Sequence, residues 1–154
     1  MENWNRTFLK RMELELETYR VDSIFLPEEG QNPDTLRQMF EIGEEEPAVV
    51  IMDMAIFETE DGREILQIFT EILLDVEESP KLLSKLNEIN LFVPFGSFGY
   101  FKQERQLYHK YNQLVKEPKD MEEFIAETVG VIDLVLGMVI SQYKELYQIA
   151  FANK

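Results

Sequence analysis

The chain has 154 residues, the size of a single domain that can bury a core of its own, and it contains no cysteine and one histidine. Thirty acidic residues against 15 basic ones give a formal net charge of −15, and such a surface repels nucleic-acid phosphates and anionic membranes. The lack of cysteine excludes disulfide frameworks, thiolate nucleophiles and zinc-finger spacings, and it suits a reducing, cytoplasmic location.

The first predicted element is a helix from Trp4 to Tyr19, because its apolar residues recur every three or four positions and form one stripe. The residues before it contain no basic patch leading into an apolar run, so we expect no signal peptide. The next segment, Val21 to Glu46, mixes short apolar runs with turn formers. Gln38 to Ile42 within it fits either a strand or a short helix, so the conformation of the segment stays open.

Ala48 to Glu58 is the clearest strand, rich in Val, Ile and Phe. Asp61 and Gly62 then predict a tight hairpin, because both residues tolerate a positive φ. Glu64 to Leu74 should pair back as a strand. Its spacing also fits a helix, and the preceding turn favours the strand.

Ser79 and Pro80 open a middle helix as its N-cap and first-turn residue. Phe95 to Phe101 and Gln106 to Val115 predict a second hairpin. A long helix should then run from Asp120 to Ala152. Its apolar middle is shorter than the about 20 residues of a membrane span, so we expect a buried helix covered on two sides.

These elements predict one α+β domain over residues 1–154. An antiparallel sheet of about five strands would carry an N-terminal helix, a middle helix and a long C-terminal helix, in the order α-β-β-β-α-β-β-α.

Nucleophilic catalysis finds little support in the sequence. A triad would need the single histidine, His109, which lies on a predicted strand, and Ser97 misses the spacing of a nucleophile elbow. We expect His109 at the surface or at a sheet edge. Asp53 and Asp133 lie inside apolar stretches and could do general acid–base work, although a solvent-facing acid explains each of them more simply.

Metal and cofactor sites also lack their usual residues. One histidine without cysteine cannot build a transition-metal site, and Glu44-Glu45-Glu46 is better explained as a solvated loop than as a weak cation site. The glycines of Gly96-Ser97-Phe98-Gly99 match no phosphate-binding fingerprint and are expected to shape a strand entry. We therefore predict no catalytic residue, metal or cofactor.

Aromatic side chains are concentrated around the second hairpin and at the end of the last helix. Alternation cannot bury all of them on one face, so we expect another chain to cover some of them; helices on both faces of the sheet are the alternative. The candidate interface residues are Phe92, Phe95, Phe98, Tyr100, Phe101, Tyr143, Tyr147 and Phe151.

Two short stretches carry a family resemblance. Leu86-Asn87-Glu88-Ile89-Asn90 ends the middle helix, and Phe95-Gly96-Ser97-Phe98 enters the next strand. Together with the element order, they resemble the type III secretion chaperone-like fold and, within it, the YbjN-like family. The resemblance implies a non-enzymatic protein that dimerises or holds an extended peptide against its sheet, and it carries over no catalytic residue.

The leading hypothesis is a chaperone-like or adaptor module that binds a protein, a peptide or a second copy of itself, and neither nucleic acid nor membrane. The alternative is an acidic inhibitor of a basic partner, such as an immunity protein, an antitoxin or a nucleic-acid mimic. It is motivated by the acidic block from Glu41 to Glu78, in which Arg63 is the single base. A small-molecule enzyme that uses Asp53 or Asp133 is the third hypothesis.

Overall fold

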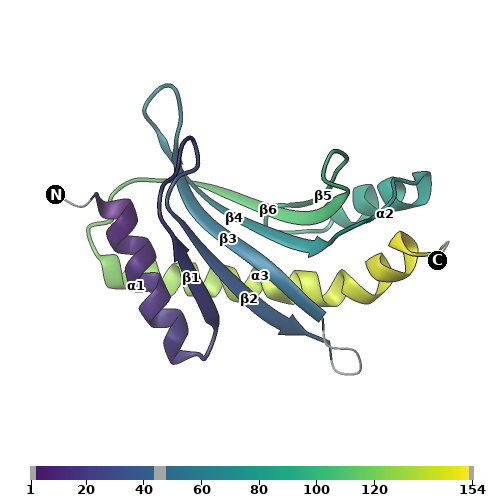
Figure 1. Cartoon of the computed structure of the whole chain (residues 1–154), viewed down its shortest axis with the longest axis horizontal. Coiled ribbons are helices and arrows are strands. Elements are labelled where there is room, and N and C mark those ends of the chain that lie inside the picture. Colours follow the sequence, from purple (N-terminus) through teal and green to yellow (C-terminus); the bar gives the residue numbers. More distant parts are fainter. Residues whose placement is uncertain (1–2, 44–47, 153–154) are drawn as a thin grey trace.

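The computed structural model describes residues 3–43 and 48–152 and shows an α+β fold (Figure 1). The predicted order of the helices is confirmed, but the sheet has six strands rather than about five. The difference comes from the segment Val21 to Glu46, which holds two strands. In chain order the elements are α1 (Trp4–Thr18), β1 (Asp22–Leu26), β2 (Thr35–Ile42), β3 (Ala48–Glu58), β4 (Glu64–Leu73), α2 (Pro80–Asn90), β5 (Ser97–Phe101), β6 (Gln106–Val115) and α3 (Met121–Ala150).

The sheet is antiparallel throughout, with the strand order β1-β2-β3-β4-β6-β5. β1 to β4 form a meander, and the β5–β6 hairpin then joins it through β6. Two edges remain, β1 and β5. At β5, the side chain of Asn90 from the end of α2 bonds both the N–H and the carbonyl of Phe98 at 2.8 Å, which occupies the outer edge of that strand.

The core lies on one side of the sheet. Alternate residues of β3 point inward (Val50, Met52, Met54 and Ile56) and are at most 5 % exposed. They join the buried stripes of α1, α2 and α3 in a single cluster. The opposite face of the sheet carries residues such as Val49, Phe57 and Leu114, which stay exposed, so the helices described here cover one face only.

β4 settles the ambiguity between strand and helix in favour of the strand. Leu66, Ile68 and Thr70 are buried at alternate positions. The hairpin before β4 is longer than the tight turn predicted from Asp61 and Gly62, because the connection runs over residues 59–63 and the Thr59 N–H bonds the Arg63 carbonyl at 2.7 Å. Gly62 still supplies the positive φ of +83° that the turn requires.

The helices begin where side-chain caps are available. Ser79 accepts the Leu82 N–H at the start of α2, and Asp120 accepts the Glu123 N–H at the start of α3. α3 is the long element of the fold and runs behind the sheet from α1 to α2 (Figure 1). Ion pairs tie it to both neighbours: Arg11 of α1 pairs with Glu122, and Lys85 of α2 pairs with Glu145.

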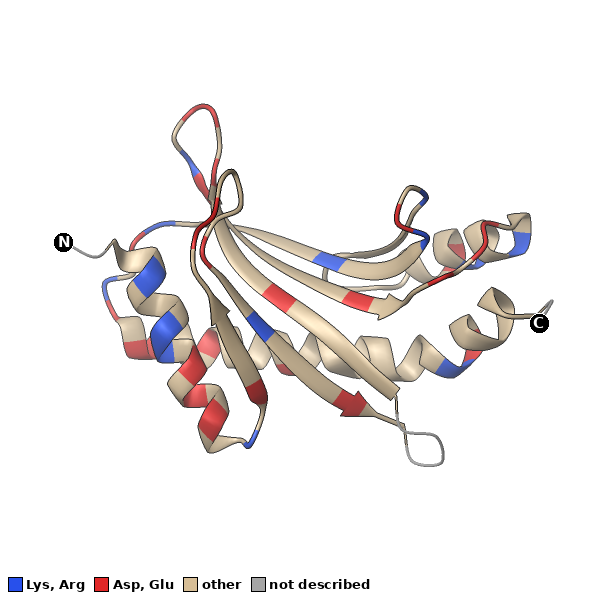
Figure 2. Cartoon of the chain, viewed as in Figure 1, with Lys and Arg blue, Asp and Glu red and all other residues tan. Residues whose placement is uncertain are grey.

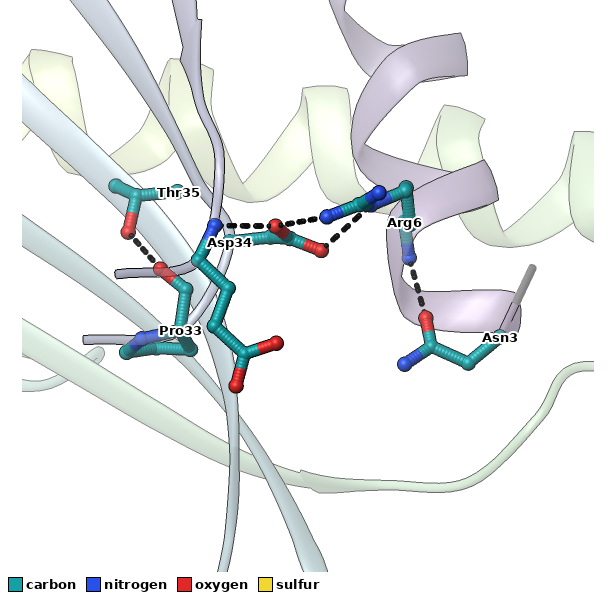
Figure 3. A network of polar contacts seen from close by, with 6 residues as sticks. Asn3, Arg6, Pro33, Asp34 and Thr35 are labelled. Carbon is teal, nitrogen blue, oxygen red and sulfur yellow. Dashed lines mark hydrogen bonds and ion pairs between the residues drawn. The ribbon is translucent and has the colours of Figure 1, made fainter. Parts of the chain in front are cut away.

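A polar network fixes α1 to the β1–β2 connection (Figure 3). The guanidinium of Arg6 donates two hydrogen bonds to the carboxylate of Asp34, at 2.9 and 2.8 Å. The same carboxylate accepts the Glu28 N–H at 2.7 Å. The hydrogen bonds from Arg6 are the largest cause that lowers the pKa of Asp34 from its usual 3.8, and the Glu28 N–H adds to it.

Candidate functional site

A groove of about 300 Å³ lies between α2, the segment that follows it, and the second half of α3. Its deepest lining is apolar, since Ile89 and Phe98 are almost fully buried. The other residues that line it are Lys85, Glu88, Phe92, Val93, Pro94, Met138, Ser141, Gln142 and Glu145. The groove therefore has an apolar base beneath a polar and charged rim.

The charged rim is organised around Lys85. Its Nζ lies 2.8 Å from a carboxylate oxygen of Glu145 on α3 and 3.7 Å from one of Glu88 on α2. The hydrogen bond that Lys85 donates to Glu145 is the main reason why the pKa of Lys85 is raised. Both carboxylates are largely exposed, so two acids and one base leave the rim with one net negative charge.

The wall of the groove carries Phe92, the most exposed large apolar side chain among the described residues, at 82 %. Its neighbour in the sequence, Leu91, is 78 % exposed but does not line the groove. They follow directly on the last turn of α2, where the chain turns towards β5. An aromatic side chain left in solvent beside an apolar cleft is typical of an interaction surface.

The structure brings only part of the predicted aromatic interface together. Phe92 and Phe98 share the groove, with Phe98 only 3 % exposed at its base. Phe101 is exposed on the open face of the sheet, and Tyr100 points inward, with its hydroxyl donating to the Val76 carbonyl at 2.6 Å. Phe95 lies at the entry to β5, where its ring is 6.2 Å from that of Tyr111.

The remaining predicted residues form a separate aromatic ladder at the end of α3. The rings of Tyr143 and Tyr147 are stacked at 6.2 Å, and Tyr147 meets Phe151 edge-on at 5.0 Å. Tyr147 and Phe151 border a shallow hollow with Leu73, Leu74 and Asp75. The eight aromatics therefore occupy several places on the fold rather than one continuous patch.

Sequence reasoning missed the helical half of the groove. Lys85, Glu145, Met138 and Gln142 were not singled out by the sequence, and Glu88 was noted only as part of the stretch that ends the middle helix. The available signal was the i,i+3 spacing of Lys85 and Glu88 on α2. Nothing in the sequence indicated that Glu145, 60 residues after Lys85, would complete the cluster.

The prediction that His109 lies at the surface or a sheet edge is wrong. β6 is the second strand from its edge, and the alternation of the strand turns the imidazole into the core, where it is fully buried. Its Nε2 lies 2.8 Å from the Phe95 carbonyl, and its ring meets that of Phe98 edge-on at 5.0 Å. Burial lowers the pKa of His109 below its usual 6.5, so the imidazole is neutral and supports the back of the groove.

His109 belongs to a buried row that crosses the sheet. Gln38, Met52, Thr70, His109 and Phe98 are successive cross-strand partners on β2, β3, β4, β6 and β5. The Gln38 amide, the Thr70 hydroxyl and His109 Nδ1 are buried without a protein hydrogen-bond partner within the described chain. This row brings three buried polar side chains together within a mainly apolar core, and no pattern in the sequence predicted it.

Neither of the two acids considered for catalysis lines the groove. Both carboxylate oxygens of Asp53 are bonded by Arg37, at 2.8 and 2.9 Å, on the open face of the sheet. Asp133 is exposed on α3 beside mainly apolar neighbours. Among the residues the structure describes, no three metal-binding side chains come together, and Glu44-Glu45-Glu46 lies outside these residues.

The acidic block of the sequence is divided in space (Figure 2). Glu58 to Glu64 surrounds the β3–β4 hairpin, whereas Asp75 to Glu78 follows the opposite end of β4. Part of its charge is paired within the chain, since Lys102 meets Glu78 at 3.6 Å and Arg105 meets Glu77 at 3.9 Å. The acids of the block that the structure describes are therefore spread over separate parts of the fold.

Among the described residues, one helix, α3, is long and apolar enough to cross a bilayer by length and composition. An 18-residue window of α3 has a mean hydropathy of 2.0, and 28 % of that window is buried inside the structure. The expectation that its middle is covered on two sides is therefore met only in part, because α3 keeps an apolar face directed outward.

Comparisons with protein-family models, with curated proteins and with solved structures found no match for this chain. The resemblance to the YbjN-like family therefore stays a prediction from the sequence.

Proposed function

We propose that this protein is a non-enzymatic binding module, of a chaperone-like or adaptor kind, that takes up a segment of a partner protein in the groove between α2 and α3. The observation that carries the proposal is the position of Phe92, 82 % exposed on the wall of that groove. Exposure of a large ring costs solvation free energy unless a partner covers it, and aromatic anchors dominate the energetics of interfaces.

The lining of the groove defines the chemistry of the segment. The apolar base formed by Ile89, Val93 and Phe98 accepts an aliphatic or aromatic side chain. Glu88 and Glu145 outnumber Lys85 on the rim, so a Lys or Arg next to that side chain would find an opposite charge. A short basic–apolar segment therefore fits better than an acidic one.

The protein's overall charge favours the same class of partner. With a net charge of −15, the chain attracts basic segments over a distance of about one Debye length, roughly 8 Å at physiological ionic strength. The attraction increases the association rate, whereas burial of apolar side chains in the groove sets the lifetime of the complex. The sequence resemblance implies the same kind of function.

A library of short random peptides displayed on phage tests the proposal. Selection on the wild-type protein should enrich segments in which Lys or Arg flanks a large apolar residue. Phe92→Ser should weaken their binding by about thirtyfold, the effect of a hot spot worth about 2 kcal/mol. Phe101→Ser is the matched control, because it removes an exposed Phe from the open face of the sheet, outside the groove.

The charged rim is tested with the same selected peptides. Glu145→Gln should weaken binding and reduce its dependence on salt, because one of the two carboxylates facing the basic residue is lost. Peptides that bind Phe92→Ser and wild type equally, or a selection that yields no consensus, would remove the groove as the binding site.

A further inference from the structure

The outward face of α3 has a composition unlike that of a solvated helix. The exposed positions in its middle are Ala126, Glu127, Gly130, Asp133, Leu134, Gly137, Ile140 and Ser141. Leu134 is 48 % exposed and Ile140 is 53 % exposed. The opposite face of the same helix is buried in the core through Val135 and Val139, so α3 is apolar on a side that no described element covers.

We propose that this face binds the same face of a second copy of the chain, with the two α3 helices antiparallel and a twofold axis passing beside Gly137. This assignment goes beyond the peptide groove and does not rest on it; the two surfaces meet at Ser141, which lines the groove and stands on this face.

One pair of opposite charges on α3, Asp133 and Lys144, is complementary in this arrangement. Consider a line that runs parallel to the axis of α3 along its outward surface and passes through Gly137. With 100° of rotation per residue, Asp133 and Lys144 lie on the same side of this line. Reversal of direction about Gly137 brings Asp133 to within about one helical turn of the partner's Lys144, and the partner's Asp133 equally close to Lys144. A parallel pair would instead set Asp133 beside the partner's Asp133, where like charges repel.

The apolar side chains are arranged symmetrically about the same point. Leu134 and Ile140 stand three positions before and after Gly137, on opposite sides of the line. In the antiparallel pair, Leu134 of one chain lies level with the partner's Ile140, so both sides of the seam are covered along its length. Antiparallel helices also align their macrodipoles favourably.

The glycines allow the close approach that such a seam needs. A Cβ placed on Gly130 or Gly137 would meet nothing within 4 Å, so neither glycine is required by packing within the chain. Two helices that meet at small residues can approach to the short end of the about 8–10 Å range of interaxial distances.

A bilayer is a poorer occupant of this face. Asp133 stands in the middle of it, and a charge at the bilayer centre costs about 3 kcal/mol or more. Full insertion would also strip Val135 and Val139 out of the protein core. A second copy covers the apolar positions, keeps the core intact and pairs the aspartate.

The first experiment measures mass in solution with the full chain. Light scattering coupled to gel filtration should give the mass of a dimer for the wild type and that of a monomer for Gly137→Glu, which sets two carboxylates against each other at the twofold axis. Ser84→Glu adds the same charge to an exposed position of α2 and should stay dimeric. A wild type that is monomeric at high concentration would overturn the proposal.

The second experiment uses the absence of cysteine from the chain. Gly137→Cys should form a disulfide-linked dimer under mild oxidation, because the two positions meet at the axis. Gly130→Cys should not link to itself but should link when mixed with Lys144→Cys, its counterpart across the seam. Self-linking of Gly130→Cys, or no linking of Gly137→Cys, would contradict the antiparallel pair.

Two further readouts separate this surface from its alternatives. Flotation with phosphatidylcholine vesicles should leave the wild type unbound; binding to vesicles that Gly137→Glu abolishes would replace the second copy with a membrane. Peptides selected on the groove should bind Gly137→Glu as well as wild type, and Phe92→Ser should remain dimeric, so each proposal can fail without the other.

Discussion

The side-chain amide of Asn90 pairs with the main chain of Phe98 as a neighbouring strand would. Its Oδ1 accepts the Phe98 N–H and its Nδ2 donates to the Phe98 carbonyl, both at 2.8 Å. The last residue of α2 therefore blocks the edge of β5 and sets the angle between the helix and the sheet at the base of the groove. Strand addition by a partner at this edge would first have to displace the amide.

Asn90→Ala should lower the free energy of unfolding by about 1–3 kcal/mol, because two partly buried main-chain groups lose their partner. It should also raise self-association at high concentration, because the β5 edge becomes available. Urea denaturation and sedimentation velocity measure the two effects. Asn87→Ala, on an exposed face of the same helix, is the control and should change neither quantity; equal behaviour of the two variants would show that the amide does not protect the edge.

Thr70→Val should stabilise the protein by about 1 kcal/mol. The Thr70 hydroxyl is buried and has no protein partner, so an isosteric methyl group removes a desolvation cost without leaving a cavity. Thr128→Val is the matched control, because its equally buried hydroxyl donates to the Phe124 carbonyl at 2.7 Å and its loss should be neutral or destabilising. A lower urea midpoint for Thr70→Val would mean that the hydroxyl is satisfied after all.

The free energy of unfolding should fall on mild acidification because of His109. Burial lowers its pKa below 6.5, so between the folded pKa and 6.5 the unfolded chain binds more protons than the folded chain. The free energy of unfolding is therefore highest above 6.5, falls as the pH drops below it, and levels off once the pH is below the folded pKa.

The chain has one histidine, so no other side chain of unperturbed pKa titrates in this window. Urea midpoints measured between roughly pH 8 and pH 5 should decrease for the wild type and stay level for His109→Gln. If the urea midpoint of His109→Gln still decreases between these pH values, the group that titrates is not His109.

Asp34 acts in a lower pH window. Its pKa is lowered from 3.8, first by the hydrogen bonds from Arg6, so its contribution is present above 3.8 and is lost as the pH falls through the folded pKa. Asp34→Asn should cost about 1–2 kcal/mol at neutral pH and flatten the acid limb of the stability curve. Asp61→Asn, which breaks a solvent-exposed pair with Arg63, should change stability by less than about 0.5 kcal/mol.

The sequence predicted the elements whose signals are local. Ser79 and Pro80 mark the start of α2, and Ala48 to Glu58 was recognised as a strand over its full length. One strand was expected between Val21 and Glu46, where the structure has two, because Asp22–Leu26 is short and Thr35–Ile42 mixes charged and apolar residues. The pairing of these two strands with each other and with β3 stabilises them. A pattern along the chain cannot reveal a partner that lies elsewhere in the sequence.

The candidate site also combines a residue that the sequence could indicate with one whose position depends on distant segments. Phe92 could be chosen from the sequence, because an excess of aromatics over buried positions is a matter of counting. The burial of His109 could not, because it depends on β5 lying outside β6 and on the turn at Gly96, whose φ is +67°. A Cβ on Gly96 would stand 2.3 Å from the Lys110 carbonyl and 2.8 Å from the imidazole, so that glycine is fixed by a contact with a strand that comes later in the chain.

The strand order has a consequence for the order of events during synthesis. β4 takes β6 as its second neighbour, and Gln67 meets Asn112 across that ladder at a separation of 45 residues. When the β1–β4 meander has left the ribosome, β6 has not yet been synthesised. The edge of β4 that pairs with β6 therefore stays unpaired while α2 and the β5–β6 hairpin are translated. Chain elongation, rather than the intrinsic speed of pairing, then limits when that edge is sealed.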